Sequence, residues 1–277
     1  GTSVDAALRL SADLGSLTPR LTLARKTRAP SLVERFSWLP TEASGGLADG
    51  NIYVGTASLK IEKAWLAEAS FDWNGESAYA RPLVYYRRLD DFIQGVPFDA
   101  TPGVLDTPVE MVSAASGDPT PLRFANIDAE ICGADIAFGT RLAGLLRLDG
   151  VASFVRGKRR DISDNLYRIA PASARVALAW EAERWSLAAE ALAVAKQQKT
   201  SATNGEVPGK GYVTFNLFGH WLVRDGLRFD VGIENLFDTY YVEHLAGYNR
   251  NSGSDVALGA RLPGAGRSGF VRLRFQM

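Results

Sequence analysis

Hydrophobic and polar residues alternate along most of the chain, most clearly near its end. Alternate residues are apolar from Leu227 to Ile233 and again from Val271 to Phe275, with mainly polar residues between them. A period of two is typical of a β-strand, because successive side chains point to opposite faces. Each run belongs to a segment of about ten residues, which is the length that a tilted strand needs to cross a bilayer. The pattern therefore predicts membrane-spanning strands.

The same alternation, interrupted by turn residues, predicts eleven antiparallel strands. They are expected near 4–13, 18–27, 59–73, 78–93, 123–138, 142–156, 173–181, 184–196, 211–223, 226–236 and 267–277. Short and long connections follow one another without exception, with short links such as 14–17, 74–77, 139–141 and 224–226. Antiparallel strands place successive connections at opposite ends of a sheet, and outer-membrane barrels have short periplasmic turns and long outer loops. The sequence thus predicts an all-β, antiparallel transmembrane barrel.

In each of four further strands, the apolar residues lie on one face of that strand. Alternate residues are apolar in 65–73, 146–154, 185–193 and 213–223, whereas the alternation in 78–93 is too irregular to assign its faces. Four of the six tryptophans lie within a few residues of a short turn: Trp73, Trp180, Trp185 and Trp221. Large aromatic residues also fill the cores of soluble β-proteins. Their gathering at one end of the strands favours the aromatic girdle of a membrane barrel.

The composition excludes several classes of partner and site. The 277 residues include 31 Lys+Arg and 31 Asp+Glu, so the formal charge of zero offers no electrostatic case for nucleic acid as a partner. The mean hydropathy of −0.07 also suits a barrel, because half of each strand faces a wet interior. A single cysteine, Cys132, excludes an internal disulfide and a cysteine-cluster metal site. No stretch of about 18 apolar residues forms a membrane helix, and the N-terminus does not resemble a signal peptide.

Several motifs resemble the TonB-dependent outer-membrane receptors, in that family's order. The segment 232–241, Gly-Ile-Glu-Asn-Leu-Phe-Asp followed by Tyr240 and Tyr241, resembles the family's penultimate-strand signature. The segments 26–36 and 51–62 are similar to its "FRAPSLxE" and "GNPxLKPE" segments, although Thr-Ala-Ser replaces Asn-Pro-x at 56–58 and Ile61 replaces proline. The end of the chain from Gly266 is similar to the family's last strand, although Gln276 and Met277 follow the final aromatic residue. The resemblance covers nearly all of the chain.

The resemblance implies active transport rather than catalysis. The expected cargo is a metal ion or metal chelate, bound by the outer loops and imported with energy from the TonB complex. Segments 165–171, 244–250, 254–256 and 261–264 resemble the copper-receptor branch, and a siderophore or other chelate receptor stays equally open. The expected partners are that cargo, outer-membrane lipid and lipopolysaccharide, and the TonB complex through a plug domain; no cofactor is expected.

Whether the number of strands is odd or even indicates how much of the barrel the chain supplies. Bacterial single-chain barrels have an even number of strands, whereas eleven are predicted here. Nothing in residues 1–277 resembles the family's plug. We therefore expect the chain to be the C-terminal portion of a larger barrel, about half of 22 strands. The sequence does not predict whether this portion closes into a ring alone.

Polar and aromatic residues of the expected long loops are candidate ligand contacts. They are Arg28, Glu34, Tyr53, Tyr167, Arg168, His244, Tyr248 and Arg250. A metal site needs two to four converging donors. His244 is a weak metal candidate, because the only other histidine, His220, lies far along the sequence on the polar face of a strand. No metal ligand is assigned.

The remaining motifs support no other activity. The basic run 156–160 is expected to be a solvated loop base that could contact anionic lipopolysaccharide, and the glycines of 205–211 lack phosphate-loop spacing. No nucleophile elbow or other catalytic set is present in the sequence. The alternatives left open are a passive porin or barrel enzyme of the same membrane, and a soluble β-sandwich.

Overall fold

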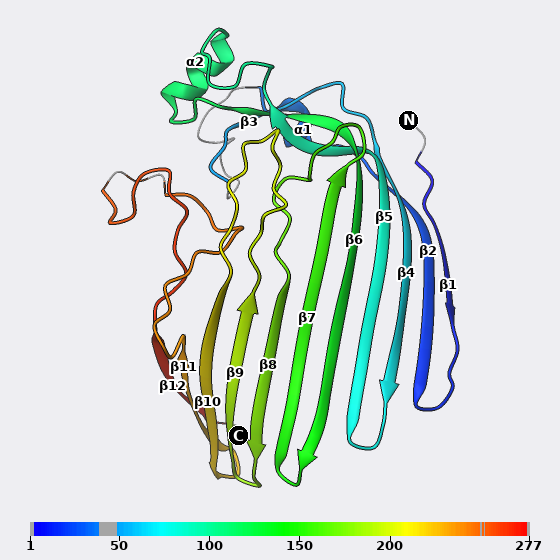
Figure 1. The fold of residues 1–277 in the computed structure, drawn as a ribbon, viewed down its shortest axis with the longest axis vertical. Helices are drawn as coiled ribbons and strands as arrows, with labels where there is room; N and C mark the ends of the chain where they lie inside the picture. Colours follow the sequence, from blue (N-terminus) through cyan, green and yellow to red (C-terminus); the bar gives the residue numbers. More distant parts are fainter. Residues whose placement is uncertain (1–2, 39–48, 250, 252, 276–277) are drawn as a thin grey trace.

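A computed structural model describes residues 3–38, 49–249, 251 and 253–275 of the chain. Most of them form one long antiparallel meander (Figure 1). Its strands are β1 (Ala6–Ser11), β2 (Leu17–Arg28), β4 (Glu62–Asn74), β5 (Ala78–Pro97), β6 (Leu122–Ala143), β7 (Leu146–Arg159), β8 (Ser173–Glu181), β9 (Trp185–Val194), β10 (Tyr212–Arg224), β11 (Leu227–Glu234) and β12 (Ser268–Phe275). The all-β, antiparallel fold class is confirmed.

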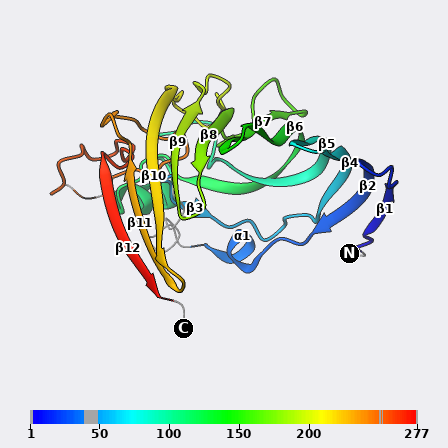
Figure 2. The same cartoon turned by 90° about the horizontal axis from the view of Figure 1, so that it is seen from below.

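The sheet is curved but not closed. Figure 2 shows it as an arch, with β1 and β12 on opposite sides. In the described chain each strand pairs with its sequence neighbours in the meander, and β1 and β12 are unpaired at their outer edges. Neither described helix has the length or apolar character needed to cross a bilayer.

Short turns gather at one end and long loops at the other, as predicted (Figure 1). One turn was misplaced: β6 and β7 are joined at 144–145, not at 139–141. Gly144 has a φ of 46°, a left-handed conformation that glycine adopts without a steric penalty. The extra length lets β6 and β7 pair as far as Ala143 and Leu146.

The long loops contain three elements that the alternation did not predict. They are α1 (Leu32–Phe36), α2 (Pro108–Ala115) and β3 (Tyr53–Val54), which pairs parallel with β6 and raises the strand count from eleven to twelve. Both helices begin at a capping box, formed by Ser31 with Glu34 and by Thr107 with Glu110. The box is a local signal that was present in the sequence.

The cross-strand register aligns the apolar residues into one continuous face. Trp180 lies opposite Leu187, Trp185 opposite Trp221, and Trp221 opposite Phe229. The three tryptophans and Leu187 are exposed rather than packed on a second sheet; Leu187, for example, is 52% exposed. All four tryptophans near the short turns lie on this apolar face. A single layer with an exposed apolar face rules out the sandwich alternative for the described chain.

Figure 2 shows α1 and β3 on the concave side of the sheet. The polar face lines this side, because Arg28 at the end of β2 donates hydrogen bonds to Glu34 of α1. It carries ion pairs such as Arg20 with Asp72 at 2.8 Å and Arg274 with Asp230 at 2.9 Å. Apolar side chains are buried mainly under the long loops. The two buried clusters are Tyr53, Leu59, Ile93, Leu122 and Phe124, and Leu89, Val96, Ile127, Ala129 and Leu166.

A β-bulge interrupts the alternation near the end of segment 78–93. The register between β5 and β6 shifts between Leu89 and Phe92, and Asp91 has a left-handed φ of 59°. The backbone amide of Asp91 donates to the Asp128 carboxylate at 3.2 Å. An extra residue interrupts the alternation of a strand, so a simple period of two cannot describe the whole segment.

Candidate functional site

The candidate site is the layer of long loops above the sheet (Figure 1). Five segments form it where the structure describes them: 29–61, 98–121, 160–172, 195–211 and 235–267. Buried polar side chains connect these segments to one another and to the ends of the strands. Seven of the eight predicted contact residues lie in this layer or at its edge, and Arg250 lies outside the described residues.

Arg28 and Glu34 join the first long loop to the sheet. Arg28 Nε and Nη2 donate to the Glu62 carboxylate at 2.6 and 2.7 Å, and its Nη1 and Nη2 donate to Glu34 at 2.9 Å each. Glu62 also accepts from the backbone amide of Ile93 at 2.7 Å. Burial opposes ionisation of Glu34, but hydrogen bonds from Arg28 and Ser31 lower its pKa below the ordinary value. Most Arg28 donors are therefore engaged in bracing the loop.

Tyr53 and Tyr167 lie at the base of the loop layer. Tyr53 is 5% exposed, and its hydroxyl donates to Asp49 at 2.5 Å. Tyr167 packs against the first buried cluster and its hydroxyl accepts from Asn51 Nδ2 at 3.2 Å. Burial raises the pKa of both phenols. Both rings are thus neutral parts of the loop scaffold at physiological pH.

His244 and Arg168 meet at Glu206, which was not predicted as a site residue. His244 Nε2 lies 3.0 Å from Glu206 Oε1, and the two side chains are only 2% and 3% exposed. The Arg168 amide donates to the same oxygen at 3.0 Å, and the Ser201 amide donates to Oε2 at 2.9 Å. One carboxylate therefore connects three loops. A buried carboxylate needs such donors to compensate for lost hydration.

The surroundings of His244 do not form a metal site. Within the described residues, the grouping of three potential ligand atoms is instead Asp99, Asp106 and Glu110, whose ligand atoms lie within 4.8 Å of one another. Glu110 Oε2 already accepts from the Thr107 amide and hydroxyl at 3.1 and 2.8 Å. We assign no metal to either group.

Tyr248 belongs to the same layer. Its hydroxyl accepts from Arg261 Nε at 3.0 Å, and Arg261 Nη2 donates to the Val207 carbonyl at 2.7 Å. The structure therefore brings five of the eight predicted residues into one scaffold: Tyr53, Tyr167, Arg168, His244 and Tyr248. Arg28 and Glu34 form a separate brace, and Arg250 lies outside the described residues.

Asp164 is a second loop connector that the sequence did not reveal. Its Oδ1 accepts from the Ala202 amide at 2.8 Å, and its Oδ2 from the Thr203 amide at 2.9 Å and the Ser201 hydroxyl at 3.0 Å. Burial opposes ionisation, but hydrogen bonds from Thr203, Ala202 and Asn165 lower the pKa of Asp164 to about 2. Its partners lie 37 to 39 residues away in the sequence, so no local pattern marks it.

The connection made by Asp164 is expected to fail in acid. Its folded pKa lies below the unfolded value of about 3.9, so the stabilisation is complete above that value and is lost as pH falls towards about 2. Hydrogen exchange of the Ala202 and Thr203 amides, corrected for the intrinsic rate, should show equal protection at pH 7 and 5 and a loss below about 4. Asp164→Asn keeps only one acceptor oxygen, so protection should be reduced at every pH. Protection of the wild type that persists at pH 2 would contradict this assignment.

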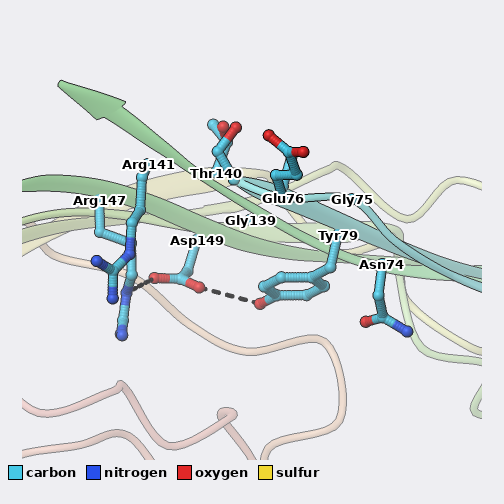
Figure 3. Close-up of a pocket in the computed structure, with 11 residues that line it drawn as sticks. Asn74, Gly75, Glu76, Tyr79, Gly139, Thr140, Arg141, Arg147 and Asp149 are labelled. Carbon is cyan, nitrogen blue, oxygen red and sulfur yellow. Dashed lines mark hydrogen bonds and ion pairs between the residues drawn. The ribbon is translucent and has the colours of Figure 1, made fainter. Parts of the chain in front are cut away.

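The polar face near the short turns carries a second group of charged residues. Figure 3 shows Tyr79 and Arg147 directed at Asp149, with distances of 3.0 and 2.5 Å to its oxygens, beside a cavity of about 230 Å³. His220 lies on the same face, as predicted, with its Nδ1 2.6 Å from the Ser186 hydroxyl. Among the described residues, no carboxylate accepts a hydrogen bond from the other ring nitrogen, so the pair lacks the acid of a hydrolytic triad.

Comparisons with known proteins identify the family. The family model described as "TonB dependent receptor-like, beta-barrel" matches residues 4–236. No curated protein matched the chain. Among solved structures, "Copper transporter OprC" is similar with a TM-score of 0.80 and 24% identity, covering 98% of this chain and 39% of its own.

Two siderophore-related structures share the fold at lower similarity. The ferric enterobactin receptor PfeA from Pseudomonas aeruginosa, in complex with enterobactin, has a TM-score of 0.68 and 19% identity, over 98% of this chain and 40% of its own. The siderophore receptor PirA from Acinetobacter baumannii has a TM-score of 0.66 and 15% identity, with the same coverage. The chain thus spans about two fifths of the length of these structures. Because the family model covers most of the sequence, the chain belongs to the TonB-dependent receptor-like β-barrel family.

Proposed function

We propose that the intact receptor takes up a metal ion or metal chelate across the bacterial outer membrane. Its long loops bind the cargo, and the TonB complex supplies the energy through a plug domain. The family match over 4–236 is the observation that carries this proposal. The similar structures, a copper transporter and siderophore receptors, support cargo of this class.

Within the loop layer, we propose that this chain contributes polar and aromatic contacts. Arg168 and Tyr248 are only half-buried, whereas Tyr53 and His244 lie beneath the surface and position the loops. The described loops gather no cluster of histidine, cysteine and methionine of the kind that binds a bare copper ion. Arg28 and Glu34 act through the brace at Glu62, and Arg250 is retained as a candidate.

We also propose that the chain forms the C-terminal portion of the receptor barrel. The supporting observations are the unpaired edges of β1 and β12 and the coverage of 39% to 40% of the similar structures. An open edge promotes aggregation, so further strands would pair with both edges. The apolar face would then contact outer-membrane lipid and lipopolysaccharide.

Uptake by the intact gene product tests the transport proposal. Cells that carry the gene should accumulate radiolabelled copper or ferric siderophore faster than deletion cells, and a protonophore or loss of TonB should abolish the difference. Uptake that persists without an energised inner membrane would indicate a passive porin. Absence of uptake for both cargo types, with the protein present in the outer membrane, would contradict the proposed cargo class.

A further inference from the structure

The apolar face of the sheet is hollowed between β5 and β9. A groove of about 630 Å³ lies on this face, where four small alanine side chains leave room. Ala134, Ala152, Ala174 and Ala193 lie on the apolar face and line the groove. Val84 and Phe154 stand beside them on the same face. The groove has the shape and chemistry to accept a flexible hydrocarbon chain.

A second, basic hollow adjoins the groove towards the long loops. It measures about 220 Å³ and shares Phe154, Ala172 and Ala195 with the groove. Arg156, Lys196 and Lys199 line it, and its lining contains no carboxylate. None of the ion pairs found among the described residues involves these three side chains. The apolar groove thus ends at a cluster of positive charges that no carboxylate of the lining neutralises.

Hydrogen bonds of Gln197 hold the walls of the basic hollow in place. Gln197 is buried, its Nε2 donates to the Ile169 carbonyl at 2.9 Å, and its Oε1 accepts from the Lys199 amide at 3.0 Å. Gln197 also exchanges two backbone hydrogen bonds of 2.9 Å with Gly209. The hollow therefore does not depend on a freely moving loop.

Arg156 lines this hollow, and its guanidinium carries one unsatisfied donor beside it. Its Nη1 is buried, and no described residue hydrogen-bonds it. A buried donor on a charged group is costly when it lacks a partner. A guanidinium matches the geometry of a phosphate, which can accept two parallel hydrogen bonds.

We propose that the groove and the basic hollow together bind one phosphorylated glycolipid of the outer leaflet, of the lipid A type. An acyl chain lies along the alanines, and a phosphate contacts Arg156 and Lys199. The proposal rests on the outer-membrane assignment above, because that assignment places the long-loop end of the apolar face in the outer leaflet. The charge of the hollow selects the phosphate, and its continuity with the groove selects a lipid.

Native mass spectrometry of the intact receptor tests this site. Purified, delipidated protein is titrated with hexa-acylated lipid A in detergent. The double variant Arg156→Gln/Lys199→Gln should weaken the first bound lipid A by about tenfold or more, since hydrogen bonds to charged groups are lost. Ala174→Leu, which fills the groove, should weaken it as well. Lys210→Gln and Ala191→Leu, on the same loop and face but outside both hollows, should bind like the wild type.

Two further titrations define the ligand and guard against misfolded variants. Wild-type protein should bind lipid A more tightly than its dephosphorylated form, and more tightly than phosphatidylglycerol. Equal binding of all three lipids, or lipid A binding unaffected in folded site variants, would overturn the proposal. Uptake by the wild-type receptor is measured separately. A receptor that binds lipid A but takes up no cargo would count against the transport proposal and leave the lipid site standing.

Discussion

Val176→Arg is expected to destabilise the membrane-inserted receptor by about 2–4 kcal/mol, the cost of arginine on the lipid face near the bilayer centre. Val176 lies near the middle of β8 on the apolar face, opposite Gly150 on β7 and Ala191 on β9. No carboxylate lies directly opposite it on either neighbouring strand. The free energy of unfolding from phospholipid vesicles, measured by guanidinium titration, checks the size of the effect.

The next residue supplies the matched control. Ala177 lies on the polar face, directly opposite Asp149 on β7 and Glu190 on β9. Ala177→Arg places its charge between two carboxylates in a wet interior, so it should cost much less than Val176→Arg. Equal destabilisation by the two variants would contradict the assignment of the two faces.

Glu206→Ala is expected to open the loop layer while leaving the strands intact. The change removes one partner of a buried pair and leaves His244 Nε2 and the amides of Arg168 and Ser201 without their acceptor. Each buried donor that is left without its acceptor costs about 1–3 kcal/mol. Hydrogen exchange should show faster exchange in 164–168, 199–206 and 243–248, with unchanged protection in β8 and β9.

Glu243→Ala is the control for this variant. Glu243 is exposed beside His244, and its side chain makes no hydrogen bond to another described residue. It should leave exchange in all three loops unchanged. Uptake should fall in Glu206→Ala and not in Glu243→Ala, because only the former disorders the proposed binding surface. Normal loop protection in Glu206→Ala would show that Glu206 does not connect the loops.

The strands were predictable because one physical requirement acts at every second residue. A lipid-facing side chain must be apolar, so the boundaries of β8 agree with the expected 173–181. The bulge at Asp91 breaks that rule near the end of β5. Before it, apolar and charged residues occur on both faces, with Leu83 and Arg87 on one face and Val84 and Arg88 on the other, so alternation could not assign them. The turn at Gly144 was placed too early because Gly139 resembles a turn residue, whereas β6 continues through it to Ala143.

The loop layer was much less predictable. The sequence correctly placed long loops at one end, and it singled out several residues that the structure brings together there. It did not indicate Glu206 or Asp164, whose partners lie tens of residues away and follow no period. The helices could have been found from their capping boxes, whereas the buried polar contacts depend on the tertiary arrangement of the loops.

The account depends on β9 presenting alternate residues to lipid. Spin labels placed singly at positions 185–193, in a receptor in which Cys132 is replaced by serine, report collision with oxygen in lipid and with a nickel chelate in water. Odd positions, including Trp185, Leu187 and Ala189, should favour oxygen, and even positions such as Ser186 and Glu190 should favour nickel. A profile without this alternation, or with the two sets of positions exchanged, would contradict a membrane-facing apolar surface.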